Sequence, residues 1–265
     1  MGSLFFPQLS SGAIAQYPIR KTRVTRSIIN SLADGTIVAS PDPSASKLIW
    51  ELSFTQLSTT DVTALQAHFL ACCGPYHAFT FIDPTDNMLV SSADLTTASW
   101  QKDPQLQVTS NAADAIGGNN AFVLTNNSAA VQSLSQQLTV PAGYQYCFSF
   151  WVQSTSSSVV AVSRQGASAG AADQLPSGNK WSRVISSGRL NDTGDQLTVG
   201  LNLSPGQQVI VFGLQLEAQI QPSPYHATFS TGGVYPGARW VSDSLPISLD
   251  APGLFSTEFS IKTNL

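Results

Sequence analysis

Short runs of alternating apolar and polar residues fill the middle of this chain, between residues 88 and 222. A period of two places every second side chain on one side of an extended backbone, which is typical of a β-strand with one buried face. The clearest example is residues 144–152, where Tyr, Phe and Val occupy every second position. The other strands predicted in this region are 121–125, 131–140, 159–163, 181–186, 197–203 and 209–216. Strands this short and this closely spaced predict a β-sandwich, and specifically a jelly roll.

The residues before this region predict a strand, a single helix and a second strand. Residues 47–57 alternate with a period of two and predict the first strand. After them, apolar residues follow helical spacing up to Cys72, and Thr59 or Thr60 can cap the helix N-terminus. Gly74 and Pro75 end this helix, and residues 78–82 predict the next strand.

The C-terminal residues, 223–265, again alternate and end in a predicted strand around Phe255–Ile261. A segment of about 43 residues with roughly three strands is too small to form a stable domain alone. We therefore expect a mainly β protein with two domains. A small α+β domain (a β-barrel or sheet plus one helix) comprises residues 1–87 plus 223–265, and it is interrupted by an inserted β-sandwich, residues 88–222.

The charge and the hydropathy of the chain argue against two classes of function. Charged residues are only 11% of the chain and the formal net charge is −4. General nucleic-acid binders neutralise many phosphates with a basic surface, so this composition argues against one. No segment approaches the ~18 consecutive apolar residues that span a bilayer, so we expect no membrane insertion.

The sequence contains no motif of an established catalytic class. It lacks the Gly-x-Ser-x-Gly nucleophile motif, and its three histidines do not occur in a catalytic pattern. Glycoside hydrolysis requires two facing carboxylates, and the sequence does not place such a pair. We therefore expect that the protein is not an enzyme, and a glycan hydrolase is the weakest of the hypotheses that we retain.

Several short motifs near the two ends of the chain occur in a distinctive order. They are Tyr17–Lys21, Trp50–Leu52, Phe79–Pro84, Arg239–Asp243 and Gly253–Phe259. In this order, with the helix between the second and third, they resemble the distal tail (tail-tip or baseplate hub) protein family of long-tailed bacteriophages and gene transfer agents. The resemblance covers roughly half of the chain, in two separated pieces.

This resemblance implies a structural protein of the virion tail, made and assembled in the bacterial host cytoplasm. Its partners would be further copies of itself in a ring, expected to be a hexamer, together with tail tube and baseplate or hub proteins. DNA would meet it only in transit through the lumen of the ring.

The middle of the chain resembles a second group. Met88–Val90, Ala98–Lys102, Trp181–Val184 and Phe212–Glu217 are similar to segments of carbohydrate-binding-type jelly rolls that are common in phage tail proteins. This resemblance implies a projecting module that binds glycans on the host surface during attachment. The alternative hypothesis is a free-standing carbohydrate-binding adhesin, in which the sandwich is the active part and the flanking segments are its mount.

Three tryptophans, Trp100, Trp151 and Trp181, are the candidate glycan contacts. An aromatic face packs well against the apolar side of a pyranose ring. Trp100 and Trp181 lie in motifs that also fit the core of a sandwich, so packing remains the alternative role for both.

Four of the twelve basic residues, Arg20, Lys21, Arg23 and Arg26, lie within seven positions. Such a run is often a solvated strand face, but in a ring it could meet a neighbouring subunit or line the lumen. If the segment is extended, alternation places Lys21 and Arg23 on one side and Arg20 and Arg26 on the other.

A structural calcium ion is the only cofactor that the jelly-roll resemblance implies. Asp83, Asp86, Asn87 and Glu217 lie near the predicted entry to and exit from the sandwich, and their oxygens are of the kind that calcium prefers. The alternative is that these residues form turns and surface acids.

Overall fold

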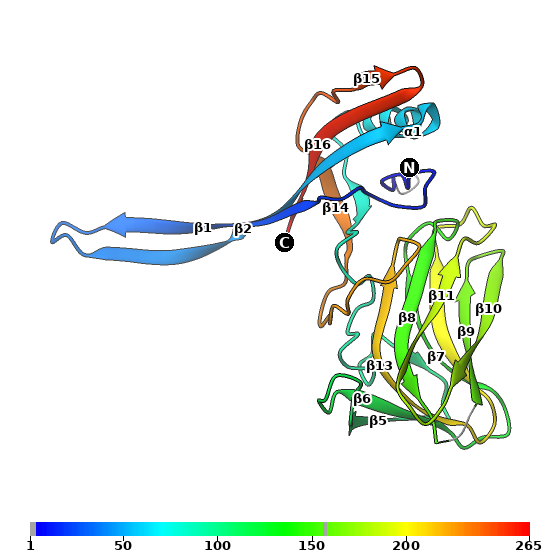
Figure 1. The fold of residues 1–265 in the computed structure, drawn as a ribbon. Helices are drawn as coiled ribbons and strands as arrows, with labels where there is room; N and C mark the ends of the chain where they lie inside the picture. Colours follow the sequence, from blue (N-terminus) through cyan, green and yellow to red (C-terminus); the bar gives the residue numbers. More distant parts are fainter. Residues whose placement is uncertain (1–3, 156–157) are drawn as a thin grey trace. The chain divides into compact units, whose positions relative to one another are not determined.

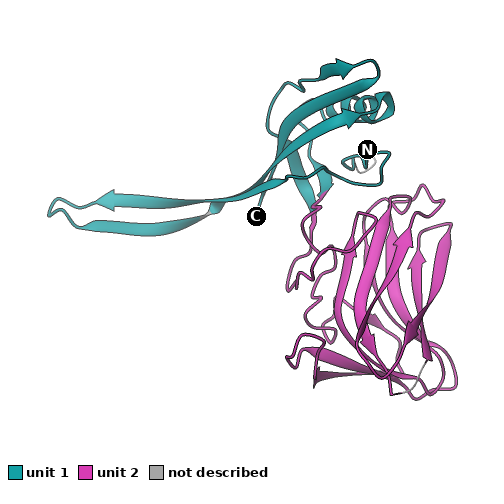
Figure 2. Ribbon diagram, in the orientation of Figure 1, with its two compact units in different colours: residues 1–81, 235–265 teal, residues 82–234 magenta. Residues whose placement is uncertain are grey.

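The computed structural model describes residues 4–155 and 158–265. The chain divides into two compact units, residues 1–81 with 235–265 (unit 1) and residues 82–234 (unit 2), as Figure 2 shows. Unit 2 thus extends beyond the predicted insertion, 88–222, at both ends. The reason is that Asn87, in the entering segment, donates hydrogen bonds to the carbonyls of Leu214 and His226, so both flanking segments pack with the sandwich.

Unit 1 is built on one sheet, with strand order β1-β2-β16-β14-β3 and β15 paired to β16. Its elements are β1 (Arg20–Ser31), β2 (Ile37–Leu57), α1 (Thr59–Ala71), β3 (Phe79–Ile82), β14 (Val234–Trp240), β15 (Ser248–Ala251) and β16 (Leu254–Asn264). Strand β16 pairs with β2 from Phe255 opposite Leu57 to Asn264 opposite Lys47. The C-terminal residues therefore complete a sheet that begins near the N-terminus, as the sequence predicts.

An aromatic cluster forms the core of unit 1. The rings of Trp240 and Phe259 lie 4.5 Å apart, and Phe54 stacks on Phe259 at 5.4 Å. The N-terminal segment adds Phe6, whose ring contacts Phe81 edge-on at 5.5 Å. Fully burying a side chain of this size stabilises the fold by about 1.5–3 kcal/mol. Because the residues of the cluster come from the N-terminal segment, β2, β3 and the C-terminal strands, their burial holds these segments together.

Helix α1 is capped by Ser58, which precedes both predicted caps, Thr59 and Thr60. The hydroxyl of Ser58 accepts a hydrogen bond from the backbone N–H of Asp61, and the Asp61 carboxylate accepts one from the backbone N–H of Ser58, which is a capping box. Thr59 and Thr60 therefore lie in the first turn and do not cap it. Asp61 also accepts from the backbone N–H of Ser10 at 2.7 Å, which fixes the N-terminal segment against the helix.

Unit 2 is a β-sandwich of two five-stranded antiparallel sheets. The first sheet has the order β10 (Gly170–Ser177), β9 (Ser158–Gln165), β12 (Leu197–Leu203), β7 (Gln132–Leu138) and β4 (Gln101–Lys102). The second has the order β11 (Ser182–Gly188), β8 (Tyr146–Gln153), β13 (Gln208–Glu217), β6 (Ala121–Asn126) and β5 (Leu106–Ala112). The predicted fold class, mainly β with a sandwich and one helix in the described part of the chain, is confirmed.

In unit 2, the strands that sequence analysis did not predict, β4, β5 and β10, lie at sheet edges. Strand β10 lacks alternating apolar residues because only one of its faces is partly covered. By contrast, the central strands β8 and β12 place apolar side chains such as Phe148, Phe150 and Leu201 in the core. Full burial of at least one face is therefore what makes a strand visible in the sequence.

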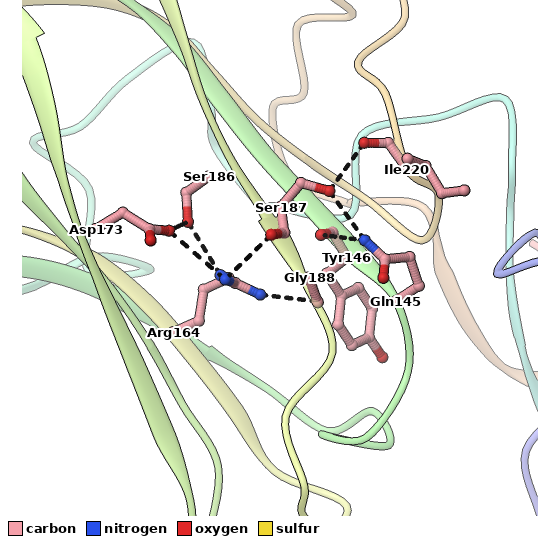
Figure 3. Close-up of polar contacts among 8 residues, drawn as sticks. All are labelled: Gln145, Tyr146, Arg164, Asp173, Ser186, Ser187, Gly188 and Ile220. Atoms are coloured by element: carbon pink, nitrogen blue, oxygen red, sulfur yellow. Dashed lines mark hydrogen bonds and ion pairs between the residues drawn. The ribbon is translucent and has the colours of Figure 1, made fainter.

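A buried arginine joins the two sheets. Arg164 of β9 reaches β11, where its guanidinium donates to the Ser186 hydroxyl at 3.0 Å and to the Gly188 carbonyl at 2.7 Å (Figure 3). Asp173, on the adjacent strand β10, lies 3.6 Å from the guanidinium and supplies the opposite charge. A charge held between two sheets in this way is tolerated because it is both paired and hydrogen-bonded.

Candidate functional site

Strands β1 and β2 continue beyond the sheet of unit 1 as a long two-stranded hairpin (Figure 1). Pairing runs from Arg26 opposite Asp42 to Ser31 opposite Ile37, and Gly35 turns the chain with a φ of +84°. Glycine adopts this left-handed conformation without a steric penalty. We call residues 25–41 the arm. An Asp-Gly pair between two apolar pairs is a sequence signal for a hairpin, whereas the basic run does not indicate one.

Every residue of the arm is exposed, including its large apolar ones. Ile28, Ile29, Leu32, Ile37 and Val38 have between 47% and 66% of their surface accessible. Burying one side chain of this type lowers the free energy by about 1.5–3 kcal/mol. A contiguous set of them on a monomer marks a surface for interaction.

The basic run begins in the part of β1 that precedes the arm, residues 20–24, which we call the root of the arm. It ends at Arg26, within the arm itself. Arg20 pairs with Glu51 at 3.4 Å, and Arg26 pairs with Asp42. Hydrogen bonds from Ser44 and from the Arg26 guanidinium lower the pKa of the Asp42 carboxyl.

The other two basic residues lie on one face, as alternation predicts. Lys21 is opposite Trp50, with its ammonium nitrogen 5.9 Å from the Trp50 ring centroid, and Arg23 is opposite Leu48. Arg23 is exposed and has no ion-pair partner among the described residues. It lines a cleft of about 480 Å³ at the root of the arm. A register shift between Val24 and Arg26 separates Arg26 from the rest of the run.

One of the three candidate glycan contacts is wrong. Trp100 is only 5% exposed, and its indole N–H donates to the carbonyl of Ser91 at 3.1 Å. Its ring therefore packs inside unit 2 and cannot stack on a sugar. The alternative role considered for this residue, core packing, is the one that the structure supports.

Trp151 and Trp181 remain accessible, but their surroundings differ. The Trp151 ring contacts Phe212 at 5.7 Å and Tyr225 at 6.3 Å, and the guanidinium of Arg183 covers it. Trp181 is half-buried and makes no ring contact with another described aromatic residue. It immediately precedes β11, two residues before Arg183. Of these two residues, Trp181 is therefore the one whose ring no other described aromatic ring contacts.

The four candidate calcium ligands make hydrogen bonds within the protein. Glu217 accepts hydrogen bonds from the side-chain amides of Gln215 and Gln219 and from the backbone N–H of Ser223. Asp83 and Asp86 accept from residues of their own turn. Over residues 4–155 and 158–265, no group of three or more His, Cys, Asp or Glu side chains could hold a metal ion.

The fourth candidate ligand, Asn87, is fully buried and has a structural role instead. Its amide oxygen accepts from the backbone N–H groups of Leu89 and Leu216, at 3.1 and 3.0 Å, and its amide nitrogen donates to two carbonyls. The side chain thus uses both of its donors and accepts two bonds, which leaves it no role as a ligand. It fastens the first segment of unit 2 to β13.

No protein-family model matches this sequence, and no curated protein matches it. Among solved structures, the enzymatically active domain of tailspike protein 4 from bacteriophage CBA120 is similar over 52% of this chain and 22% of its own, with 14% identity and a TM-score of 0.40. The CBM22-1 xylan-binding domain of Paenibacillus barcinonensis Xyn10C is similar over 54% of this chain and 97% of its own, with 16% identity and a TM-score of 0.42.

A further similar structure is TmCBM61 in complex with β-1,4-galactotriose, with 16% identity, a TM-score of 0.34 and coverage of 49% of this chain and 97% of its own. These structures are a phage tailspike domain and carbohydrate-binding modules, and no family match identifies a distal tail protein.

Within the described residues, no helix combines the length and apolar character needed to cross a membrane.

Proposed function

We propose that this protein is a non-enzymatic structural subunit of a phage tail tip or baseplate. Copies of it join into a ring, expected to be a hexamer, and each copy carries its sandwich as a module for glycans of the host surface. The observation that carries the proposal is the arm, because its apolar side chains are exposed in the single chain.

The energetics of the arm favour an assembled state. A two-stranded hairpin alone in water is at best marginally stable, and this one extends past the sheet that supports its root. Its distal residues are all exposed, so their apolar surface is available to a partner. Burial against a partner would both remove this surface from water and stabilise the hairpin.

The distribution of charge favours a second copy as that partner. Strand β1 contains four basic residues and no acidic residue, while the whole chain has a net charge of −4. The rest of the chain therefore carries a net charge of −8, which complements β1 of a neighbouring copy. A contact between two different patches of the same chain is heterologous, and it closes into a ring when the rotation allows.

In this proposal the protein is located in the virion tail after assembly in the host cytoplasm. Its other partners are tail tube and baseplate or hub proteins, and DNA only passes through the lumen. Lys21 and Arg23 then lie at an interface between copies or toward the lumen.

The mass of the purified full-length protein tests this proposal. We expect mass photometry to find a hexamer, or an oligomer that stacks into one, and electron microscopy to find closed rings. A chain that stays monomeric at micromolar concentration would refute self-assembly.

A free-standing carbohydrate-binding adhesin is the second candidate, and it is favoured by the half-buried Trp181, whose ring no other described aromatic ring contacts. An aromatic face that is not covered by another ring can stack on the apolar side of a pyranose ring. A monomer that binds a glycan on an array, and loses that binding in Trp181→Ala, would favour the adhesin.

A further inference from the structure

We infer that the arm is buried on both of its faces in the assembled protein, held by neighbouring copies of this chain rather than lying on the surface of one. This inference rests on the proposed self-assembly. It concerns how the arm is enclosed, which the existence of a ring does not determine.

The pairing register assigns the apolar residues to two faces. In an antiparallel pair, residues directly opposite share a face and successive residues alternate. Ile28 lies opposite Ser40, and Val38 lies opposite Asn30, so Ile28 and Val38 belong to one face, which we call the first face. Ile29 lies opposite Ala39, and Ile37 lies opposite Ser31, so Ile29 and Ile37 belong to the second face.

Both faces are thus suited to burial. A ribbon that lies on a protein surface has an apolar face toward the protein and a polar or charged face toward water. Here each face presents two large aliphatic side chains, and those of the second face are the more exposed. The only charged residue between Ser27 and Ser40 is Asp34, in the turn. The arm therefore has no face that is built for solvent.

Its edges lead to the same conclusion. Strand β1 is the terminal strand of the unit 1 sheet, so its outer edge presents backbone N–H and C=O groups without a strand partner. Proteins normally protect such edges with charged side chains or proline. Between Ser27 and Ser31, β1 contains neither, which suits an edge that is covered by a neighbouring chain.

A second copy has the chemistry to enclose the arm. The body of unit 1 exposes large apolar side chains of its own, among them Leu70, Tyr76 and Leu249, each with at least 66% of its surface accessible. Outside β1 the chain carries a net charge of −8, which complements the basic root of the arm. One chain therefore supplies the apolar arm, further exposed apolar side chains, and a net negative charge outside β1.

Two matched double substitutions separate the faces. Ile28→Thr/Val38→Thr makes the first face polar, and Ile29→Thr/Ile37→Thr makes the second face polar. Threonine keeps a β-branched shape and a high β-propensity, so the hairpin itself is preserved. Val131→Thr/Val159→Thr is the control, because it makes the same change at two exposed valines of unit 2.

The readout is the concentration at which the assembly dissociates, followed by mass photometry across a dilution series. We expect each arm variant to raise this concentration at least tenfold, and the control to leave it unchanged. All four arm residues are exposed in the single chain, so the melting temperature of the dissociated protein should not change in either variant. Amide hydrogen exchange should also be slower throughout the arm in the assembled wild type than in the dissociated one.

The remaining outcomes distinguish this inference from the proposed function. If only one face weakens assembly, the arm lies on a single surface, and the inference fails while self-assembly stands. If the wild type assembles and neither double substitution weakens its assembly, the arm does not form the contact between copies and the inference fails. A wild type that is monomeric alone, and assembles only with an added tail tube protein, would assign the arm to that partner and overturn both.

Discussion

The guanidinium carbon of Arg183 lies 4.5 Å from the ring centroid of Trp151. Arg183 also donates to the hydroxyl of Ser149 at 3.0 Å, which holds it in this position. Gly213, at a positive φ, brings the backbone of β13 so close that a Cβ there would be 2.9 Å from the indole. Trp151 is therefore enclosed by packing partners, which favours a structural role over a sugar-stacking one.

We predict that Trp151→Ala destabilises unit 2 by about 2–4 kcal/mol, since it removes a large ring from a packed site. Trp181→Ala, which removes the same side chain where no other ring contacts it, should change the free energy of unfolding by less than about 1 kcal/mol. Denaturant unfolding of the full chain measures both. Equal effects of the two substitutions would contradict the distinction.

Replacing Lys21 and Arg23 together with Gln should weaken assembly and leave the melting temperature of the dissociated protein nearly unchanged. Both side chains are exposed, and exposed charges contribute little to the stability of a single chain. At an interface they would meet the acidic remainder of another copy. Arg20→Gln is the control, since Arg20 already pairs with Glu51 in its own chain. Normal assembly of the double variant would make the run an ordinary solvated face.

Stability should fall as the pH drops from about 6.5 toward 4, because of His68. This residue is buried against Phe6 and Phe79, and burial lowers its pKa to about 4. Between the two pKa values the unfolded chain binds a proton that the folded chain does not, so stability is present above pH 6.5 and is lost toward pH 4.

The pKa shift corresponds to about 2 kcal/mol of lost stability at pH 5 relative to pH 7. Urea unfolding of the wild type at the two values measures it. His68→Leu, which cannot be protonated, should lose most of this difference, and an equal pH dependence in wild type and variant would exclude His68 as its source.

Asn87→Ala should destabilise unit 2 by about 3 kcal/mol or more, since it leaves four backbone groups, three of them buried, without their partner. Asn119→Ala, at an exposed position, is the matched control.

Because hydrogen bonds within the protein occupy Asn87 and Glu217, the melting temperature should be the same with added calcium and with a chelator. A rise in melting temperature with calcium would show a site that these contacts do not reveal.

Sequence periodicity predicted the elements whose pattern is local. Strand β12 begins and ends at the predicted residues, 197 and 203, and the strands beginning at Phe79 and Ala121 differ from prediction by one residue at most. The helix was located correctly, although Ser58 rather than a threonine caps it. In each case the alternation or the helical spacing is produced by residues within one element, so no knowledge of its neighbours is needed.

The sequence by itself determined which residues share a face, but only the tertiary structure decided what covers that face. Trp100 and Trp181 both occur in motifs that fit a sandwich core, yet Trp100 is buried with a hydrogen-bond partner and Trp181 is not. Likewise, the pairs Ile28-Ile29 and Ile37-Val38 look like core residues in sequence, and the structure leaves them exposed on the arm. Burial depends on contacts between segments far apart in the chain, and a local period contains no information about them.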